Sequence, residues 1–225
     1  MACYKILCVS DHIDPLVYSD SIKERFSDID MVLGAGDLDL TYYGYIVSML
    51  NKPLAFVFGN HNLKRISHYR REYRTDLLQT EGDGEFLQKS YGSTYVGGKA
   101  IKFHGLLIAG LGGSIDYNRG RNQFTEGQMF FRILRMVPKL LFFRIFYKRW
   151  IDILLTHAPP RDIHDREDRC HRGFKTFRWF MKFFKPKYLV HGHVHLYDLN
   201  DIRTSKYMQT VVVNAYEHTV IEIEV

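Results

Sequence analysis

The chain has 225 residues, 46% of them apolar and 25% charged, a balance typical of globular proteins that excludes a disordered or fibrous chain. The formal net charge is +6 and unevenly placed; a cationic stretch implies an anionic partner such as phosphate, nucleic acid or lipid, with a solvated Lys/Arg-rich helix face as the alternative. Three cysteines form no paired pattern, which predicts a chain without a disulfide framework, working in a reducing compartment such as the cytoplasm.

Short apolar runs alternate with helical segments in the first part of the chain. The first run, 4–9, predicts a buried strand, and it has neither the basic start nor the length of a signal peptide. Helices are predicted at 19–26, with Ser19 or Asp20 as cap, and at 41–50. Two more buried strands are predicted, at 30–36 and 54–60. This strand–helix–strand order predicts a parallel sheet with right-handed crossovers.

The pattern changes at 94–109, where glycine turns separate three predicted strands. Helices follow at 124–149, broken or kinked near Pro138, and at 172–184. A buried strand is predicted at 150–157, and a strand that runs into a loop at 187–195. The segment 209–225 predicts two strands paired as a hairpin. No apolar run approaches the roughly 20 residues that span a bilayer. Residues 1–225 therefore predict one α/β domain with mixed parallel and antiparallel strands.

Five of the apolar runs end in side chains of the types that bind metal ions. Since ligands bind beyond the carboxyl ends of strands in open α/β sheets, we expect these side chains to converge on one pocket. Each alone would be typical of a turn or a helix cap, so the prediction depends on their conjunction. Alternate histidines in HGHVH (191–195) would point the same way on an extended segment. The side chains are Asp11, His12, Asp14, Asp37, Asn60, His61, His157, His193 and His195.

In order and spacing, the motifs GD (36–37), GNH (59–61), TH (156–157) and GHVH (192–195) resemble those of the calcineurin-like metallophosphoesterases. The resemblance extends over residues 8–195. It implies a four-layer sandwich of two mixed β-sheets flanked by helices, with a metal site at the carboxyl ends of the strands. It also implies a hydrolase that cleaves a phosphomonoester or phosphodiester by attack of a metal-bound hydroxide.

The resemblance assigns each motif residue a role. Asp37 would bridge two divalent ions, and His61 would face the substrate phosphate as the catalytic side chain without binding metal. The remaining ligands would be Asn60, His157 and His193 for one ion, and Asp11 and His195 for the other. Mixed oxygen and nitrogen ligands favour Mn, Fe or Zn as the two ions.

Two positions depart from the family pattern. Where the family has Asp-x-His, this chain has Asp11-His12-Ile13-Asp14, so an isoleucine replaces a metal-binding histidine. We expect Asp14 to reach the metal directly or through water, His12 to point away, and this site to be the weaker of the two. Asn62 follows GNH, where the family usually has an acid that orients the histidine.

Two further residues are predicted to contact the substrate phosphate. His171 lies between the TH and GHVH motifs, and Arg161 follows the two prolines after TH. A surface position is the alternative for both. For the whole protein, the altered first motif leaves open a non-catalytic metal-binding or scaffold protein that retains the fold. The retained His61 favours the enzyme, because it offers nothing to metal binding alone.

The positive charge is concentrated in residues 132–187, which hold 15 Lys/Arg and 5 Asp/Glu. The segments 129–150 and 174–188 each contain seven aromatic residues among these basic ones. We expect 174–188 to fill the core. Residues 129–150 carry more apolar surface than one helix face can bury, so contact with an anionic lipid or membrane surface stays open beside core packing. Stacking on nucleic-acid bases is an alternative, but no stable nucleic-acid partner is predicted.

Overall fold

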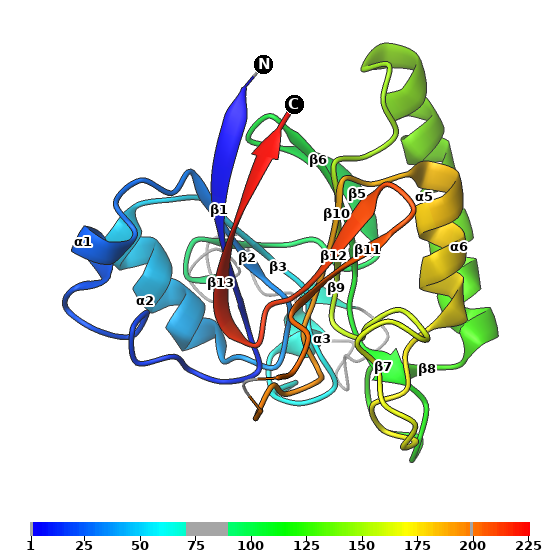
Figure 1. Ribbon diagram of the computed structural model, residues 1–225, viewed down its shortest axis with the longest axis horizontal. Helices are drawn as coiled ribbons and strands as arrows, with labels where there is room; N and C mark the ends of the chain where they lie inside the picture. Colours follow the sequence, from blue (N-terminus) through cyan, green and yellow to red (C-terminus); the bar gives the residue numbers. More distant parts are fainter. Residues whose placement is uncertain (1, 71–89, 199) are drawn as a thin grey trace, which may run out of the picture.

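Two β-sheets packed face to face form the centre of the computed structural model, which describes residues 2–70, 90–198 and 200–225 (Figure 1). The first sheet has the order β13-β1-β2-β3-β4, in which β1 to β4 are parallel and β13 is antiparallel to β1. Its strands are β1 (Cys3–Ser10), β2 (Met31–Gly34), β3 (Leu54–Phe56), β4 (Ser93–Tyr95) and β13 (Glu217–Glu224).

The second sheet has the order β11-β12-β10-β9-β6-β5, with parallel strands at its centre and the antiparallel β11 and β5 at its edges. A separate parallel pair joins β7 (Ser114–Ile115) to β8 (Gln123–Phe124). The strands of the large sheet are β5 (Lys99–Phe103), β6 (Leu106–Leu111), β9 (Ile153–Thr156), β10 (Tyr188–His191), β11 (Thr204–Tyr207) and β12 (Thr210–Asn214).

Helices cover the outer face of each sheet (Figure 1). The first sheet is covered by α1 (Ile22–Arg25), α2 (Leu40–Leu50) and the short α3 (Ile66–Tyr69), and the second by α5 (Glu126–Phe146) and α6 (Lys175–Phe184). Alternation along β1 explains the layers, because Ile6 and Cys8 lie between the sheets whereas Leu7 packs under the helices. The four-layer sandwich of two mixed sheets is confirmed.

Side-chain caps mark the starts of the two longest helices in the described part of the chain. The Asp39 carboxylate accepts a hydrogen bond from the Thr41 N–H at the start of α2, and Thr125 and Gln128 form a capping box at the start of α5. Of the break or kink predicted near Pro138, the break is wrong, because α5 continues through this residue. Its missing N–H removes one bond of the helical ladder, which packing of α5 on the second sheet outweighs.

The predicted C-terminal hairpin is also wrong. β12 pairs with β10 and β11 in the second sheet, whereas β13 crosses to the first sheet and pairs with β1. The hairpin partner of β12 is β11, joined to it through Met208 and Gln209. The β11 sequence, TSKY, is polar and half exposed, so it carries little of the apolar alternation that predicts a strand.

The remaining differences are shorter elements. α1 begins after Ser21 rather than after Ser19 or Asp20, and its cap side chain makes no capping hydrogen bond. β10 ends at His191, and His193 has a φ of 70°, so HVH is a turn rather than the extended segment expected. None of the helices among the described residues is long and apolar enough to cross a membrane.

Candidate metal centre

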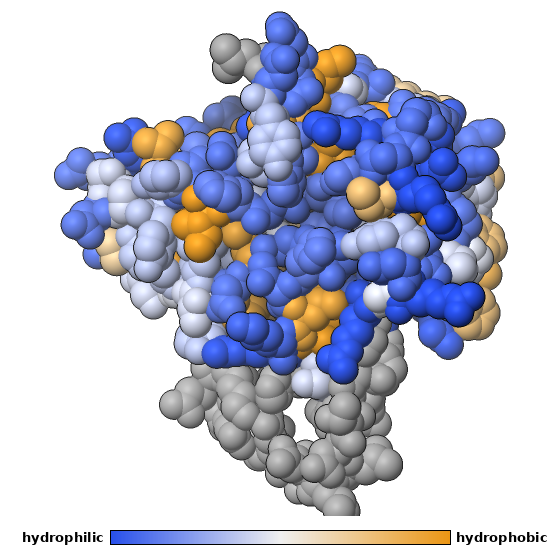
Figure 2. Space-filling model, turned by 90° about the horizontal axis from the view of Figure 1, so that it is seen from below, coloured by the Kyte–Doolittle hydropathy of each residue, from blue (hydrophilic) through white to orange (hydrophobic). Residues whose placement is uncertain are grey.

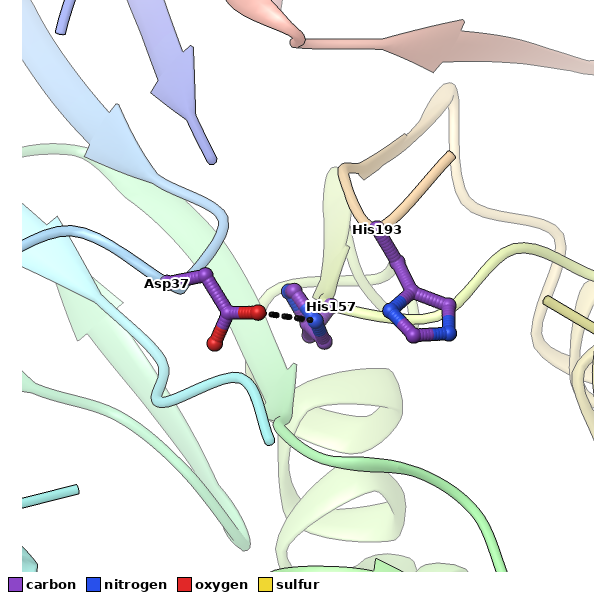
Figure 3. A group of neighbouring side chains, drawn as sticks. All are labelled: Asp37, His157 and His193. Carbon is purple, nitrogen blue, oxygen red and sulfur yellow. Dashed lines mark ion pairs between the residues drawn. The ribbon is translucent and has the colours of Figure 1, made fainter. Parts of the chain in front are cut away.

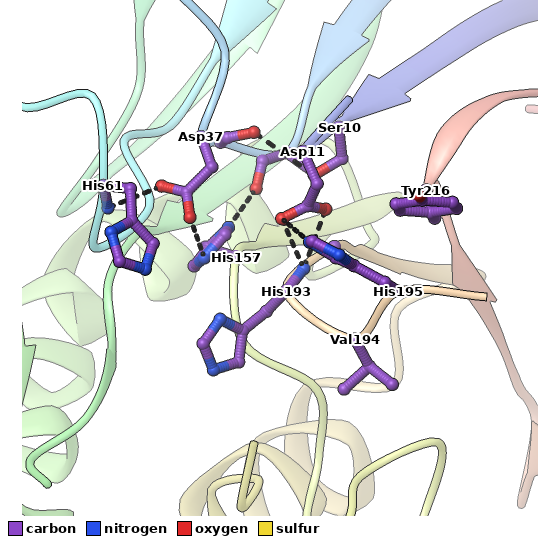
Figure 4. Close-up of polar contacts among 12 residues, drawn as sticks. Ser10, Asp11, Asp37, His61, His157, His193, Val194, His195 and Tyr216 are labelled. Atoms are coloured by element: carbon purple, nitrogen blue, oxygen red, sulfur yellow. Dashed lines mark hydrogen bonds and ion pairs between the residues drawn. The ribbon is translucent and has the colours of Figure 1, made fainter. Parts of the chain in front are cut away.

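The carboxyl ends of five strands, from both sheets, meet at one end of the sandwich (Figure 4). The first sheet contributes the residues that follow β1, β2 and β3, and the second contributes those that follow β9 and β10. The structure thereby brings together nearly all the strand-end side chains singled out in the sequence. They are Asp11, Asp37, Asn60, His61, His157, His193 and His195.

Asp37, His157 and His193 form the buried centre of this group (Figure 3). One potential ligand atom from each lies within 4.8 Å of the others. The His157 Nδ1–H donates to the Ala35 carbonyl at 2.8 Å, which leaves Nε2 directed at Asp37 Oδ2, 3.3 Å away. Nε2 is also 3.0 Å from the Asn60 amide oxygen. A backbone carbonyl thus fixes the tautomer that presents Nε2 to a metal ion.

A second carbonyl orients His193. Its Nε2–H donates to the Cys170 carbonyl at 2.6 Å, leaving Nδ1 without a proton. Burial, together with the charge on His157, lowers the pKa of His193 to about 3. His193 is therefore neutral at physiological pH, the state in which imidazole binds metal.

Asp11, Asp37 and His157 shift one another's pKa values. Burial disfavours both ionised forms, but the pairing of Asp37 with His157 outweighs it and lowers the Asp37 pKa to about 2. The same pairing, aided by Asp11, raises the His157 pKa to about 9. A metal ion at Nε2 would therefore displace the proton that His157 carries there at neutral pH. Burial raises the pKa of Asp11, and the nearby charge of Asp37 raises it further. Two buried carboxylates close together favour a cation between them.

Asp11 and His195 extend the group toward the C-terminal strand. Both Asp11 oxygens accept the His193 backbone N–H, at 3.0 and 2.9 Å, and His195 Nε2 lies 3.9 Å from Asp11 Oδ1. The His195 ring stacks on Tyr216, with centroids 4.8 Å apart, and its Nδ1 bonds the Tyr197 hydroxyl. These contacts direct Nε2 toward Asp11 (Figure 4).

His61 lies beside Asp37 but is exposed, unlike the central residues. Its backbone N–H donates to Asp37 Oδ1 at 2.8 Å. Asn62 donates through its side chain to the Asp37 carbonyl at 2.7 Å, so it braces the loop of Asp37. The acid expected at position 62 is thus replaced by a residue that supports a neighbouring ligand.

The structure does not bring the rest of the first motif into the group. Asp14 accepts the Leu16 N–H through one oxygen, at 2.7 Å, and a hydrogen bond from His218 through the other. His12 is exposed, with its Nδ1 3.5 Å from a Glu217 oxygen. Ile13 is partly exposed and offers no ligand atom. The ion near Asp11 would therefore have fewer side-chain ligands than the ion at His157.

The two predicted phosphate contacts differ in position. The His171 ring centroid lies 5.3 Å from that of His193, at the rim of the centre, and its Nδ1 bonds Asp168. Arg161 instead pairs with Asp165 at 2.8 Å and with Glu167 at 3.0 Å. Its guanidinium thus holds together its own loop.

Several supporting groups had no signal in the sequence. The Asn60 side-chain N–H donates to the Tyr117 hydroxyl at 3.2 Å, which aims the Asn60 oxygen at His157. Of these groups, Tyr197 alone lies close in sequence to a motif residue, two positions after His195. The carbonyls of Ala35 and Cys170, and the ring of Tyr216, act through contacts distant in sequence.

Comparisons with known proteins identify a matching family and matching folds. The family model of the calcineurin-like phosphoesterases matches residues 4–197. One crystal structure superposes with a TM-score of 0.66 at 14% identity, covering 98% of this chain and 95% of its own. TT1561 of Thermus thermophilus superposes with a TM-score of 0.59 at 16% identity, covering 96% and 90%. No curated protein matches the chain. At these identities the structural matches establish the fold alone.

Proposed function

The chain belongs to the calcineurin-like phosphoesterase family, and we propose that it is a metal-dependent hydrolase of phosphate esters. The observation that carries the proposal is that two carboxylates with buried side chains lie at the strand ends beside the Asn60 amide oxygen and three histidines. Backbone carbonyls hold two of those histidines in the tautomer that leaves the facing nitrogen available. A polar cluster with only a structural role does not need histidine rings oriented so that one nitrogen faces the centre.

The donor set fits two divalent ions of the Mn, Fe or Zn type, since it mixes oxygen and nitrogen. We propose that Asp37 contributes to both ions, that Asn60, His157 and His193 complete one, and that Asp11 and His195 complete the other. Ions held there would act as Lewis acids on the phosphate ester and make water nucleophilic at neutral pH.

The chain's own residues have the remaining tasks. We propose that His61 hydrogen-bonds the substrate phosphate and stabilises or protonates the leaving oxygen, because it is exposed beside the centre yet anchored through its backbone to Asp37. His171, at the rim near His193, is proposed as a further phosphate contact. The ion pairs of Arg161 argue against a similar role for that residue.

A panel of esters tests the proposal. Metal-stripped protein reloaded with Mn²⁺ is assayed with an aryl phosphomonoester and an aryl phosphodiester, each with and without chelator. We expect turnover of at least one ester, lost on chelation, and the preferred ester assigns the protein as a phosphatase or a phosphodiesterase. Full metal content without turnover of either ester would instead support a metal-binding protein without catalysis.

Two features bear on where the protein works. All three cysteines are free, and Cys3 is exposed, which supports our proposal of a reducing, cytoplasmic environment. The basic aromatic segment 129–150 supports contact with an anionic lipid surface, a proposal that does not depend on the reaction.

A further inference from the structure

Helix α5 is apolar on two opposite sides. Met129, Ile133, Leu140 and Phe143 recur at helical spacing and are buried against the second sheet. A surface helix of a globular protein needs only this one apolar stripe. On the opposite side lies a second stripe, which we call the outer face of α5: Phe130, Phe131, Leu134, Leu141, Phe142, Ile145 and Phe146.

The outer face of α5 is open to solvent. Ile145 is 60% exposed and Phe146 is 65% exposed. Pale orange, apolar side chains appear along part of the right-hand edge of Figure 2, the side on which α5 and α6 lie in Figure 1. Contiguous apolar surface of this kind marks an interaction site, whereas single exposed apolar residues do not.

The charged residues of α5 that follow Glu126 are all basic. Residues 127–151 contain no Asp or Glu, and several of their cations lie against exposed rings. Arg135 lies over the Phe131 ring at 4.6 Å, and Lys139 over the Phe142 ring at 4.7 Å. The basic residues of this stretch are Arg132, Arg135, Lys139, Arg144, Lys148 and Arg149.

We propose that the outer face of α5 docks on a bilayer surface rich in anionic lipid, with the helix lying in the plane of the interface. The apolar side chains would enter the boundary between headgroups and acyl chains, while Arg135 and Lys139 meet lipid phosphates at its edge. This arrangement combines both signals that interfacial binding requires, buried apolar area and electrostatic attraction.

The charge pattern argues against a second copy of the chain on this face. In a two-fold dimer the same patch meets itself, so the cations of one α5 would face those of the other. The stretch 127–151 has no acid that could neutralise them. An anionic lipid surface has the complementary charge.

Vesicle co-sedimentation tests the proposal. We expect the wild type to bind vesicles of equal parts phosphatidylglycerol and phosphatidylcholine, and to bind pure phosphatidylcholine at least about tenfold more weakly. The double variant Ile145→Glu/Phe146→Glu should lose at least about tenfold in binding to the anionic vesicles. The matched control is Ile202→Glu/Met208→Glu, whose residues are 66% and 54% exposed elsewhere on the surface and should bind as the wild type does.

A charge series tests the electrostatic part. Arg135→Gln/Lys139→Gln should weaken binding several-fold at low salt, whereas Lys23→Gln/Arg25→Gln on α1 should not. Thermal melts of every variant verify folding, and sedimentation velocity reports the oligomeric state.

Three results would overturn the proposal. They are wild-type protein that stays in the supernatant with the anionic vesicles, equal binding to neutral and anionic vesicles, and a wild-type dimer that Ile145→Glu/Phe146→Glu converts to monomer. The last would assign the face to a second copy of the chain.

Discussion

Asp11, Asp37 and His193 all have left-handed backbone conformations, with φ of 65°, 58° and 70°. Non-glycine residues rarely adopt this region, and each such residue costs of order 1–3 kcal/mol. The bends turn the chain sharply at the strand ends. Other non-glycine residues outside the site also have a positive φ, but these three bends lie at the strand ends and set the course of the loops that carry Asp11, Asp37 and His193.

Asp37 offers the most direct test of the ligand assignment. Asp37→Ala should lose bound metal at both positions, because its carboxylate is the one proposed to be shared. Elemental analysis after dialysis measures the loss. Asp39→Ala, which removes only the cap of α2, is the matched control and should retain the metal. Normal metal content in Asp37→Ala would exclude the bridging role.

His61 separates catalysis from metal binding. His61→Ala should keep its metal but lose about 10²–10⁴ in the rate of ester hydrolysis, the usual range for an acid or an electrostatic helper. Steady-state assays on protein of verified metal content measure this. A rate equal to that of the wild type would show that the side chain does not act on the substrate.

Ile13 tests the altered first motif. Ile13→His should tighten the ion near Asp11, because it adds a ligand to a position now served by Asp11, His195 and the shared Asp37. Calorimetric titration of stripped protein should show two unequal steps in the wild type that converge in the variant. Two equally tight steps in the wild type would mean that another group already fills this position.

The motif residues of the site could be predicted from the sequence, because their side-chain types bind metal ions and their order matches the family pattern. The groups that orient them could not. The carbonyls of Ala35 and Cys170 are backbone atoms, present at every residue, and only the fold directs them at His157 and His193. The engagement of Asp14 by His218 depends on β13 lying beside β1, which the sequence did not predict.

At the scale of elements, strands with strong apolar patterns were predicted well and their pairing less so. The segment 209–225 contains two strands, as expected, yet a hairpin was inferred because they are adjacent in sequence. Adjacency cannot distinguish a hairpin from a crossing between sheets. The hairpin partner of β12 is the polar β11, whose sequence lacks the apolar alternation that would have predicted a strand.

Helix α6 allows a stability prediction with an internal control. Phe180 is fully buried and Phe183 is 50% exposed on the same helix. Phe180→Ala should lower the free energy of unfolding by about 3–5 kcal/mol, since it removes the ring and leaves a cavity. Phe183→Ala should change it by less than about 1 kcal/mol. Urea denaturation measures both, and equal losses would contradict the packing of α6 on the second sheet.

At the scale of the molecule, the proposed ligands are divided between the two sheets. Asp11, Asp37 and Asn60 follow strands of the first sheet, and His157 and His193 follow strands of the second. The centre therefore depends on the apolar layer between the sheets, which sets their relative position. A change that shifts one sheet against the other would therefore disturb the metal site. The outer face of α5 lies apart from this layer, on the outside of the second sheet.

Titration of activity with metal tests the central claim most directly. Stripped protein receives Mn²⁺ in increments, and the rate of aryl ester hydrolysis is followed against equivalents added per chain. We expect no activity without metal and a rise to a plateau at two equivalents, with the second equivalent bound more weakly. Full hydrolysis by protein shown by elemental analysis to be metal-free would contradict a metal-dependent phosphoesterase.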